Sequence, residues 1–311
     1  MYFAYLGWYW VNAAENKGAD PSAMNVSVVI PVYNRQRDGE RAVRSALGGG
    51  EPMAEVIIVD DASSPPFVLP SDLATDGRVR LVRHKVNQGE SAARNTGSAE
   101  AGSDWIAFLD SDDYWLAQKL AEQVAFAAAD QAMHPNPMTF YAHGFVQINE
   151  NTGRRRALIP AEGGTAGEFA SGCWFMQGST VRIHKQAAAA SGPCDPNLRR
   201  MQDLDWFMRI ALAGGRLKVA PFIGSVILVG ARPSPEAIEV ACKYIEGKWF
   251  SDQALPADMR RLLSAYLDVE RAASRRYAGQ MFGAAYYLVR SLVKAPRPRV
   301  PLKRWWDEVA L

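Results

Sequence analysis

The feature that most constrains this chain is a series of short apolar segments between residues 26 and 109, separated by segments with helical periodicity. The predicted strands are Val26–Tyr33, Glu55–Val59, Val79–Val82 and Trp105–Leu109. The helices between them include one that ends at Leu47 and one over Glu90–Glu100. Strands that are apolar along their whole length and alternate with helices indicate a parallel sheet covered on both faces. Because ligands bind at the carboxyl ends of the strands in such sheets, the residues after each strand are the first candidates for a site.

The rest of the sequence continues this alternation and then becomes helical. The pattern predicts helices over residues 115–129 and 203–213, and strands over 139–148, 154–159, 178–183 and 219–229. From Pro235 to Pro296 it is helical throughout. The expected fold class is α/β, with a mostly parallel sheet flanked by helices. We expect an N-terminal extension (1–23), a catalytic domain (24–231) and a helical C-terminal appendage with a basic tail (232–311).

Composition excludes several classes of protein. The chain is 48% hydrophobic and 22% charged, which is typical of globular proteins and not of disordered or fibrous ones. No apolar run approaches the ~18–20 residues that span a bilayer, because the longest candidate, Val219–Ala231, contains a proline and two glycines. Cys173, Cys194 and Cys242 have the spacing of neither a disulfide framework nor a metal site. They indicate buried thiols in a reducing compartment, so we expect a cytoplasmic protein.

The two ends of the chain differ in character from its middle. Residues 1–23 are aromatic and then polar, without the basic n-region of a signal peptide. They are interpreted as an extension without function, and an interfacial anchor built on Trp8, Tyr9 and Trp10 is the alternative. Between Arg271 and Arg304 there are nine Lys or Arg residues and no acid, whereas the remainder has 26 basic and 33 acidic residues.

The basic segment 271–304 predicts a peripheral contact with anionic membrane surfaces, at the inner face of the plasma membrane. Between its charges lies a broad apolar helix face, formed by Met281, Phe282, Ala285, Tyr286, Leu288, Val289 and Leu292. The alternative is that this face packs on the acidic body as ordinary tertiary structure. Basic residues interleaved with aromatic ones are not found in the body of the chain, so no nucleic acid partner is expected.

Carboxylates cluster where the predicted strands end. They are Asp60 and Asp61 after the second strand, Asp110, Asp112 and Asp113 after the fourth, and Asp203 and Asp205 at a later helix start. An aspartate at such a position is often only a helix cap, but a cap needs one aspartate and not three within four positions. Crowded carboxylates repel one another unless a cation lies between them, and Mg²⁺ or Mn²⁺ prefers oxygen ligands. The segment 110–113 therefore predicts a divalent metal site.

A carboxylate-held metal that keeps open positions usually shares them with phosphates. The phosphate-binding sequences GxxxxGK[ST] and GxGxxG are absent, so we expect the phosphate to be held through the metal. Nothing in the sequence is suited to bind a γ-phosphate. A metal-bridged diphosphate of this kind is suited to act as a leaving group, which points to the chemistry of nucleotide sugars.

Four segments resemble glycosyltransferase family 2 in their order and spacing. They are Val28-Val-Ile-Pro-Val-Tyr-Asn-Arg35, Ile57-Ile-Val-Asp-Asp-Ala-Ser63, Asn87-Gln-Gly-Glu-Ser-Ala-Ala-Arg-Asn95 and Phe108-Leu-Asp-Ser-Asp-Asp113. A fifth segment, residues 201–210, is similar to the family's acceptor-side segment. The resemblance covers residues 24–230 and implies an inverting, metal-dependent enzyme of the Rossmann-like GT-A fold. It implies transfer of a sugar from a nucleotide sugar, UDP by family preference, to a glycan or lipid-linked acceptor during bacterial surface polysaccharide synthesis.

By this resemblance, several residues at the strand ends are expected to bind the nucleotide sugar. They are Pro31, Tyr33, Arg35, Asp60, Asp61, Asn87, Gly89, Arg94, Asp110 and Ser111. Asp61, with Asp60 beside it, resembles the carboxylate that accepts a hydrogen bond from uracil. Arg94 is expected to contact phosphate or the acid cluster, and the alternative is a helix-face residue paired with Glu90 at i,i+4.

The resemblance also implies catalytic roles. Asp112 is the expected ligand of Mn²⁺ or Mg²⁺, and Asp110 lies near the ribose or the metal. Asp203 matches the base that takes the proton from the acceptor hydroxyl, while the metal stabilises the departing diphosphate. Gln202 and Trp206 are expected on the acceptor side, although a buried helix aromatic is an equal alternative for Trp206.

The chain departs from the family at two points. Gln202 stands where the family more often has Glu, which removes a charge beside the base. After the last predicted core strand, Arg232 occupies a segment in which many members also carry a histidine, so no third metal ligand is assigned. Asp205 and Arg209 are interpreted as a structural i,i+4 pair. All histidines are interpreted as non-catalytic: His84, His134, His143 and His184.

Two other functions remain open at this point. A degenerate module of the same fold, which binds a sugar nucleotide or glycan without turnover, would be favoured by the loss of Asp112 or Asp203, and both are present. A sugar nucleotidyltransferase would need a Gly-rich loop with Arg and Lys after the first strand. The segment Asn34–Gly39 does not provide such a loop.

Overall fold

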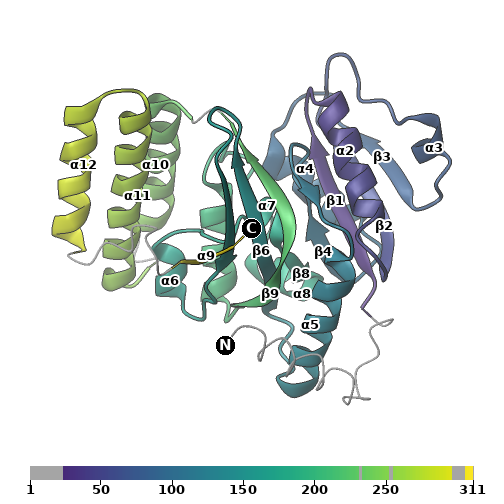
Figure 1. The fold of residues 1–311 in the computed structure, drawn as a ribbon. Helices are drawn as coiled ribbons and strands as arrows, with labels where there is room; N and C mark the ends of the chain where they lie inside the picture. The colour runs from purple at the N-terminus through teal and green to yellow at the C-terminus, as the bar shows by residue number, and fades with distance from the viewer. Residues whose placement is uncertain (1–23, 231–232, 252–254, 296–304, 311) are drawn as a thin grey trace.

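The computed structural model describes residues 24–230, 233–251, 255–295 and 305–310. Figure 1 shows a twisted sheet with helices on both sides and a layer of three further helices at one end. The strands are β1 (Val26–Val32), β2 (Met53–Asp60), β3 (Val79–Arg83), β4 (Trp105–Phe108), β5 (Tyr114–Trp115), β6 (Thr139–Asn149), β7 (Arg155–Pro160), β8 (Arg182–His184), β9 (Arg216–Val229) and β10 (Trp306–Val309). The helices are α2 (Gln36–Leu47), α3 (Ser71–Ala74), α4 (Glu90–Glu100), α5 (Lys119–Met133), α6 (Ala166–Ala170), α7 (Gln177–Thr180), α8 (Lys185–Ser191), α9 (Gln202–Leu212), α10 (Pro235–Phe250), α11 (Ala257–Tyr277) and α12 (Met281–Lys294).

The sheet has a parallel half and a mixed half. Strands run in the order β10-β7-β6-β8-β4-β1-β2-β3, and β1 pairs in parallel with both β2 and β4. Beyond β4 most pairs are antiparallel, although the long strand β9 lies parallel to β6. The parallel half is the part that the sequence predicted from its alternating strands and helices. Because β1, β2 and β4 run the same way, their carboxyl ends meet at one edge.

The strands of the parallel half are buried on both faces. In β1, Val28 and Ile30 belong to a core that includes Ala42 and Val43 of α2. Val29, between them, joins the other core, which α4 covers. Successive side chains of a strand point to opposite faces, so a strand with helices on both sides has to be apolar at every position. This burial explains the continuous apolar segments of the sequence.

Two elements differ from the pattern predicted around residues 115 and 178. Tyr114 and Trp115 pair with β9 as strand β5, so the following helix begins at Lys119 and not at residue 115. Residues 177–180 form the short helix α7 in place of a strand, and the strand β8 begins only at Arg182. Ser179, within α7, donates its hydroxyl hydrogen bond to buried Asp113. This polar contact is long-range, and local strand propensity does not register it.

The C-terminal helices share a core with the sheet. Ile238 and Ile245 of α10 and Leu263 of α11 belong to the same buried cluster as Phe169 and Trp174. After α12 the chain returns to the sheet, where β10 pairs antiparallel with β7. The segment 306–309 is therefore a strand, which the sequence pattern did not predict. Residues 1–23, Arg232 and most of the stretch 294–304 lie outside the described residues, so expectations about them stay predictions.

Within the described residues, no helix has the length and apolar character needed to cross a bilayer.

Candidate active site

A cavity of about 530 Å³ opens at the edge where the strands of the parallel half end. Ligand pockets in proteins have volumes of roughly 300–1,000 Å³, so this cavity can hold a small molecule. The cavity is lined by nine of the residues expected to bind the donor or metal: Pro31, Tyr33, Arg35, Asp61, Asn87, Gly89, Asp110, Ser111 and Asp112. The remaining expected residues, which do not line it, are Asp60, Arg94, Gln202, Asp203 and Trp206.

Asp61 fixes one wall of the cavity. Its carboxylate accepts hydrogen bonds from the backbone N–H groups of Gln88 (2.9 Å) and Gly89 (2.7 Å). It also lies 2.7 Å from Nδ1 of His84, whose Nε2 is 2.9 Å from Thr96 Oγ1. His84 therefore does not stand alone, but its contacts are those of a group that positions Asp61. These hydrogen bonds connect the end of β2 with the start of α4 in this wall of the cavity.

Gly89 allows a second chain segment to approach this wall. It has φ +94°, a conformation that side-chain-bearing residues rarely adopt. A Cβ atom here would lie 2.3 Å from the guanidinium of Arg199, which donates a 3.0 Å hydrogen bond to Asn87 Oδ1. Arg199 and its neighbour Arg200 both line the cavity, and sequence reasoning missed them. The signal was present, because the two arginines directly precede the segment 201–210.

Asp60 is structural and does not reach the cavity. Its buried carboxylate accepts hydrogen bonds from the backbone N–H groups of Ser63 and Phe67 (both 3.0 Å) and from Nε of Arg83 (2.9 Å). Burial would raise the pKa of Asp60, but these hydrogen bonds and the charge of Arg83 outweigh burial and lower it. The expectation that Asp60 shares the nucleotide site with Asp61 is corrected, because consecutive residues at the end of a strand point to opposite sides.

Asp110 and Asp112 lie on the same cavity wall, each beside an arginine. Asp112 forms an ion pair with Arg35, and Asp110 Oδ1 accepts a 2.8 Å hydrogen bond from Arg94. Burial raises the pKa of Asp110, the charge of Arg94 partly lowers it, and the charge of Asp112 raises it again, so that it stands above its ordinary value. Asp113 points away, accepting hydrogen bonds from Ser179 Oγ and from the backbone of β9.

The carboxylates of Asp110 and Asp112 fit a divalent cation that keeps positions open for phosphate. Their mutual repulsion, which contributes to the raised pKa of Asp110, is what an added cation would relieve. Within the described residues, no group of three or more His, Cys, Asp or Glu side chains is arranged to hold a metal ion. The protein ligands available here are thus the two carboxylates of Asp110 and Asp112, which suits Mg²⁺ or Mn²⁺ shared with phosphate oxygens.

Arg94 joins the donor side of the site to α9. Its side chain is only 3% exposed, and it donates to Asp203 Oδ1 at 2.6 Å as well as to Asp110. It also lies 2.5 Å from a carboxylate oxygen of Glu90. Both interpretations of Arg94 are therefore realised, since it pairs with Glu90 and with the acid cluster. Because its guanidinium is occupied by three carboxylates and does not line the cavity, a phosphate contact is not expected for it.

Glu90 is a cavity residue that sequence reasoning assigned only a pairing role. It is the first residue of α4, lines the cavity, and receives a hydrogen bond from Gln202. Burial, together with the charges of Asp110 and Asp203, raises the pKa of Glu90 to about 7, against the opposing effect of Arg94. Its side chain nevertheless keeps 43% exposure. A carboxylate that starts a helix at a strand end was the available signal.

On α9, Asp203 and Trp206 have different surroundings. Asp203 lies in the first turn with its side chain 15% exposed, held by Arg94. Trp206 is buried: its Nε1 donates to the carbonyl of Gly192 (3.0 Å), and its ring packs edge-on against Phe108. The expectation that Trp206 lines the acceptor site is therefore wrong, and the alternative of a core aromatic is correct.

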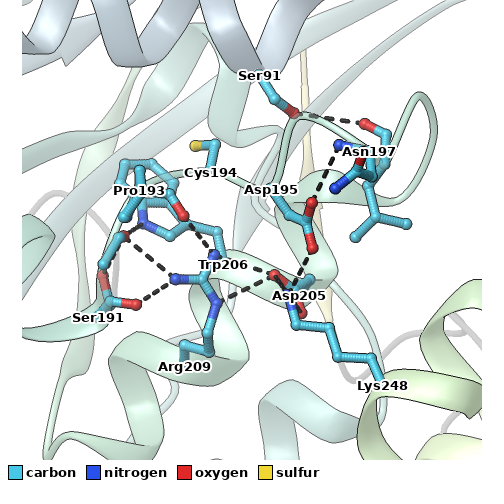
Figure 2. Close-up of polar contacts among 12 residues, drawn as sticks. Ser91, Ser191, Pro193, Cys194, Asp195, Asn197, Asp205, Trp206, Arg209 and Lys248 are labelled. Carbon is cyan, nitrogen blue, oxygen red and sulfur yellow. Dashed lines mark hydrogen bonds and ion pairs between the residues drawn. The ribbon is translucent and has the colours of Figure 1, made fainter.

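Asp205 anchors α9 to α10. Figure 2 shows Arg209 and Lys248 converging on its carboxylate. Arg209 and Lys248 each lie 3.0 Å away, and Trp249 Nε1 donates a 2.9 Å hydrogen bond to the same group. Arg209 also donates to the carbonyl of Pro193, and Lys248 to Asp195 (Figure 2). This network fixes the loop that leads to Arg199, and it confirms that Asp205 and Arg209 are a structural pair.

Comparison with known proteins gives a family match for residues 27–177 and similar folds among solved structures. Residues 27–177 match the family model described as Glycosyl transferase family 2. The β-1,3-glucosyltransferase WfgD of Escherichia coli, named as acting from UDP-Glc on GlcNAc-diphosphoundecaprenol, is 32% identical over 41% of this chain and 48% of its own length. The teichuronic acid biosynthesis glycosyltransferase TuaG of Bacillus subtilis, a putative assignment in its name, is 39% identical over 32% of this chain and 41% of its own. The matched part of this chain spans half or less of the length of the curated relatives that it matches, WfgD among them.

Among solved structures, Staphylococcus aureus TarS (residues 1–349) is similar with a TM-score of 0.59 and 17% identity. The match covers 86% of this chain and 81% of that one. The same protein in complex with UDP-GlcNAc gives a TM-score of 0.59 over 88% of this chain. This likeness concerns the fold alone. It confirms the expected α/β architecture of GT-A type with helices at its C-terminal end.

Proposed function

We propose, from the premise that residues 27–177 are a glycosyltransferase family 2 domain, that this chain transfers a sugar from a nucleotide sugar to a hydroxyl group of an acceptor. UDP is the proposed nucleotide, and a glycan or a lipid-linked sugar is the proposed acceptor. The observation that carries the proposal is the single cavity that gathers Asp61, Asp110 and Asp112, together with the link from Asp110 through Arg94 to Asp203.

The donor is proposed to lie along the cavity from Asp61 to Asp110. Near Asp61, the nucleotide base would meet Pro31, Tyr33 and a wall held by fixed hydrogen bonds. Arg35, Arg199 and Arg200 supply positive charge for the diphosphate, because guanidinium groups bind phosphate oxygens in bidentate geometry. Arg35 would exchange its partner Asp112 for phosphate when donor binds, since the two cannot be engaged fully at once.

Asp112 and Asp110 are the proposed holders of a divalent cation. When bound, Mn²⁺ or Mg²⁺ would supply electrostatic stabilisation of the charge that develops on the departing diphosphate. Asp112 is the more available of the two, because its partner Arg35 lines the cavity, whereas Arg94, the partner of Asp110, is buried. Asp110 remains tied to Arg94, and this contact keeps its carboxylate in place beside Asp112.

Asp203 is the proposed general base. The acceptor hydroxyl oxygen attacks the anomeric carbon, the bond from that carbon to the diphosphate oxygen breaks, and the hydroxyl proton passes to Asp203. One displacement of this kind inverts the anomeric configuration and needs no covalent enzyme intermediate. Arg94 donates to Oδ1 of Asp203, so Oδ2 is the oxygen expected to receive the proton.

The similar proteins support the proposed substrates. WfgD is named for a UDP-glucose donor and a lipid-diphosphate-linked acceptor, and TarS has been crystallised with UDP and with UDP-GlcNAc. By analogy, a UDP-sugar donor and a role in bacterial surface polysaccharide synthesis, at the cytoplasmic side of the plasma membrane, are proposed for this chain.

The test is a donor screen that measures nucleotide release from UDP-, GDP- and dTDP-sugars, with Mn²⁺, with Mg²⁺ and with a chelator. We expect release of UDP from one UDP-sugar, dependent on metal and increased by a lipid-diphosphate-linked sugar acceptor. Asp203→Asn is the matched control, because it should bind the donor without turning it over. Binding of UDP-sugars without release, in the presence of varied acceptors, would instead favour a binding module of the same fold.

A further inference from the structure

Helix α12 carries an apolar surface that no other described element covers. In Figure 1 it is the outermost helix of the layer formed by α10, α11 and α12. It packs on α11 through small side chains such as Ala284 and Ser291, which are buried. Its outer side exposes seven large apolar or aromatic side chains: Met281, Phe282, Tyr286, Leu288, Val289, Leu292 and Val293. Phe282 is 96% exposed and Val293 is 77% exposed.

An exposed surface of this kind requires an explanation. Single exposed apolar residues are common, but contiguous apolar patches on a protein surface usually mark an interaction site. The alternative that this face packs against the acidic body is contradicted, since these side chains are accessible in the folded chain. Six of these seven residues belong to the apolar face that the sequence predicted, and Val293 is added to it.

The charges around α12 identify the partner. The helix contains no acidic residue, and it carries Arg290 and Lys294 at its C-terminal end. The nine residues that follow Ala295 in the sequence include four more Lys or Arg and again no acid. A second copy of this face would therefore meet it without a single carboxylate to pair with these cations. An anionic lipid surface offers both an apolar layer and the opposite charge.

The expected role of Arg271 and Arg275, two of the basic residues before α12, has to be corrected. Arg271 is buried against Glu239 and Glu246, and Arg275 lies beside Glu239. These charges stabilise the packing of α11 on α10 and are not available to a membrane. Arg290 and Lys294 both pair with buried Asp268, which accounts for only one of their two charges. Apolar contact is thus the main contribution from the described residues, and electrostatic attraction is secondary.

We propose that α12 docks on an anionic phospholipid bilayer, with its axis along the surface and the outer side chains of α12 inserted at the boundary between head groups and acyl chains. A helix of 14 residues is about 21 Å long and too short to span the hydrocarbon layer, so it lies in the interface. Tyr286 and Tyr287, whose rings contact the Arg290 guanidinium, have the amphipathic character that suits the head-group level.

The experiment is flotation of the full-length protein with vesicles of phosphatidylcholine, with and without phosphatidylglycerol. The test variant is Phe282→Gln with Val289→Gln, since glutamine is neutral and a good helix former. Val68→Gln is the matched control, because Val68 is a similarly exposed valine in the loop after β2, outside α12. We expect the wild type and the control to float with anionic vesicles. The affinity of the double variant for these vesicles should be lower by a factor of roughly ten or more.

Each other outcome would overturn the proposal. Equal flotation of wild type and double variant would remove α12 from the contact. A dimer in sedimentation that the double variant converts to monomer, without vesicle binding, would make a second copy the occupant. Vesicle binding that appears only after removal of residues 1–23 would mean that this segment covers the helix. The wild type and both variants should unfold at similar temperatures, since the exchanged side chains are exposed.

Discussion

At the level of single residues, the site depends on one guanidinium shared by three carboxylates. Arg94 contacts Glu90, Asp110 and Asp203, so the cluster keeps an excess of negative charge. The excess is consistent with the raised pKa values of Glu90 and Asp110, in which burial is the largest cause. A cluster of this kind gains stability when a cation or a proton arrives. The donor side and the acceptor side of the proposed reaction are thus electrostatically linked through Arg94.

Asp203→Asn tests the proposed base. The substitution keeps the shape of the side chain and removes its basicity, so transfer should slow while donor binding is preserved. A general base typically contributes ~10²–10⁴-fold, and we expect kcat to fall by about that factor at an unchanged Kd for the donor. Steady-state kinetics together with donor titration measure both quantities. Near-normal turnover would require a different base, and Asp205 is not available because Arg209, Lys248 and Trp249 surround it.

Glu90→Gln tests the unusual environment of Glu90. Its pKa in the folded protein is about 7, above the ordinary 4.5. At pH values between 4.5 and about 7, Glu90 is therefore protonated in the folded state, whereas the unfolded state has released this proton. Stability contributed by this group is present below the ordinary value and is lost as pH rises through 7. The free energy of unfolding of Glu90→Gln minus that of the wild type should therefore be larger at about pH 8 than at about pH 5. Urea unfolding at both pH values measures the difference, and an equal difference at both would contradict the assignment.

Part of the site could be predicted from residues alone, and the limit is visible at Asp60 and Asp61. The pattern of strand ends correctly indicated that both aspartates lie at the edge that carries the site. It could not decide which one faces the cavity, because that depends on the contacts of Asp60 with Arg83 and with the loop at Ser63. In the same way, Arg199 enters the cavity only because a distant glycine, Gly89, leaves room for it.

At the level of elements, the position of α9 is secured by charged groups buried between it and α10. Asp205 has no exposed side-chain surface and accepts contacts from Arg209, Lys248 and Trp249 (Figure 2). Because Asp203 lies two residues earlier on the same helix, this network also determines where the proposed base is held. The C-terminal helices therefore support the site although they contribute no residue to the cavity.

Asp205→Ala should destabilise the protein strongly. Removing one partner of a buried ion pair leaves the other charges uncompensated, which typically costs about 3–5 kcal/mol. Glu40→Ala is the matched control, because Glu40 forms an i,i+4 pair with Arg44 at the surface, where such pairs contribute ~0–1 kcal/mol. Denaturant unfolding gives both free energies. A loss for Asp205→Ala as small as that for Glu40→Ala would mean that the network does not hold α9.

Strands and helices with strong periodicity were predicted correctly. The elements that were missed are those whose conformation depends on contacts with residues far away in the sequence. The helix Glu90–Glu100 was predicted with the bounds that the structure shows. Strand β10, in contrast, exists because the chain returns after α12 to pair with β7, where Trp305 stacks on Trp174. Helix α7 replaces a predicted strand through contacts of Ser179 with residues far along the chain. Neither contact can be predicted from the local sequence.

At the level of the whole molecule, the two halves of the sheet have different tasks. The parallel half supplies the cavity wall at Pro31, Asp61 and Asp110, and its apolar strands make that edge rigid. The mixed half and the helices α10 and α11 share one core, against which α9 packs. The parallel half joins the same apolar core through residues such as Val29 and Ile57, and Arg94 with its partners adds a polar link to α9. We infer that donor binding and base position are coupled there, since a change in charge at Asp110 acts on Asp203 through the same guanidinium.

The most direct test of this account is calorimetric titration of UDP into the wild type and into Asp112→Ala, each with Mn²⁺ and with a chelator. We predict metal-dependent UDP binding by the wild type and by Asp203→Asn, and a loss of that metal dependence in Asp112→Ala. The fold of Asp112→Ala should survive, because removing one carboxylate from a crowded cavity wall relieves repulsion. Unchanged, metal-dependent affinity for UDP in Asp112→Ala would contradict the proposal that this cavity is a nucleotide-sugar site organised by Asp110 and Asp112.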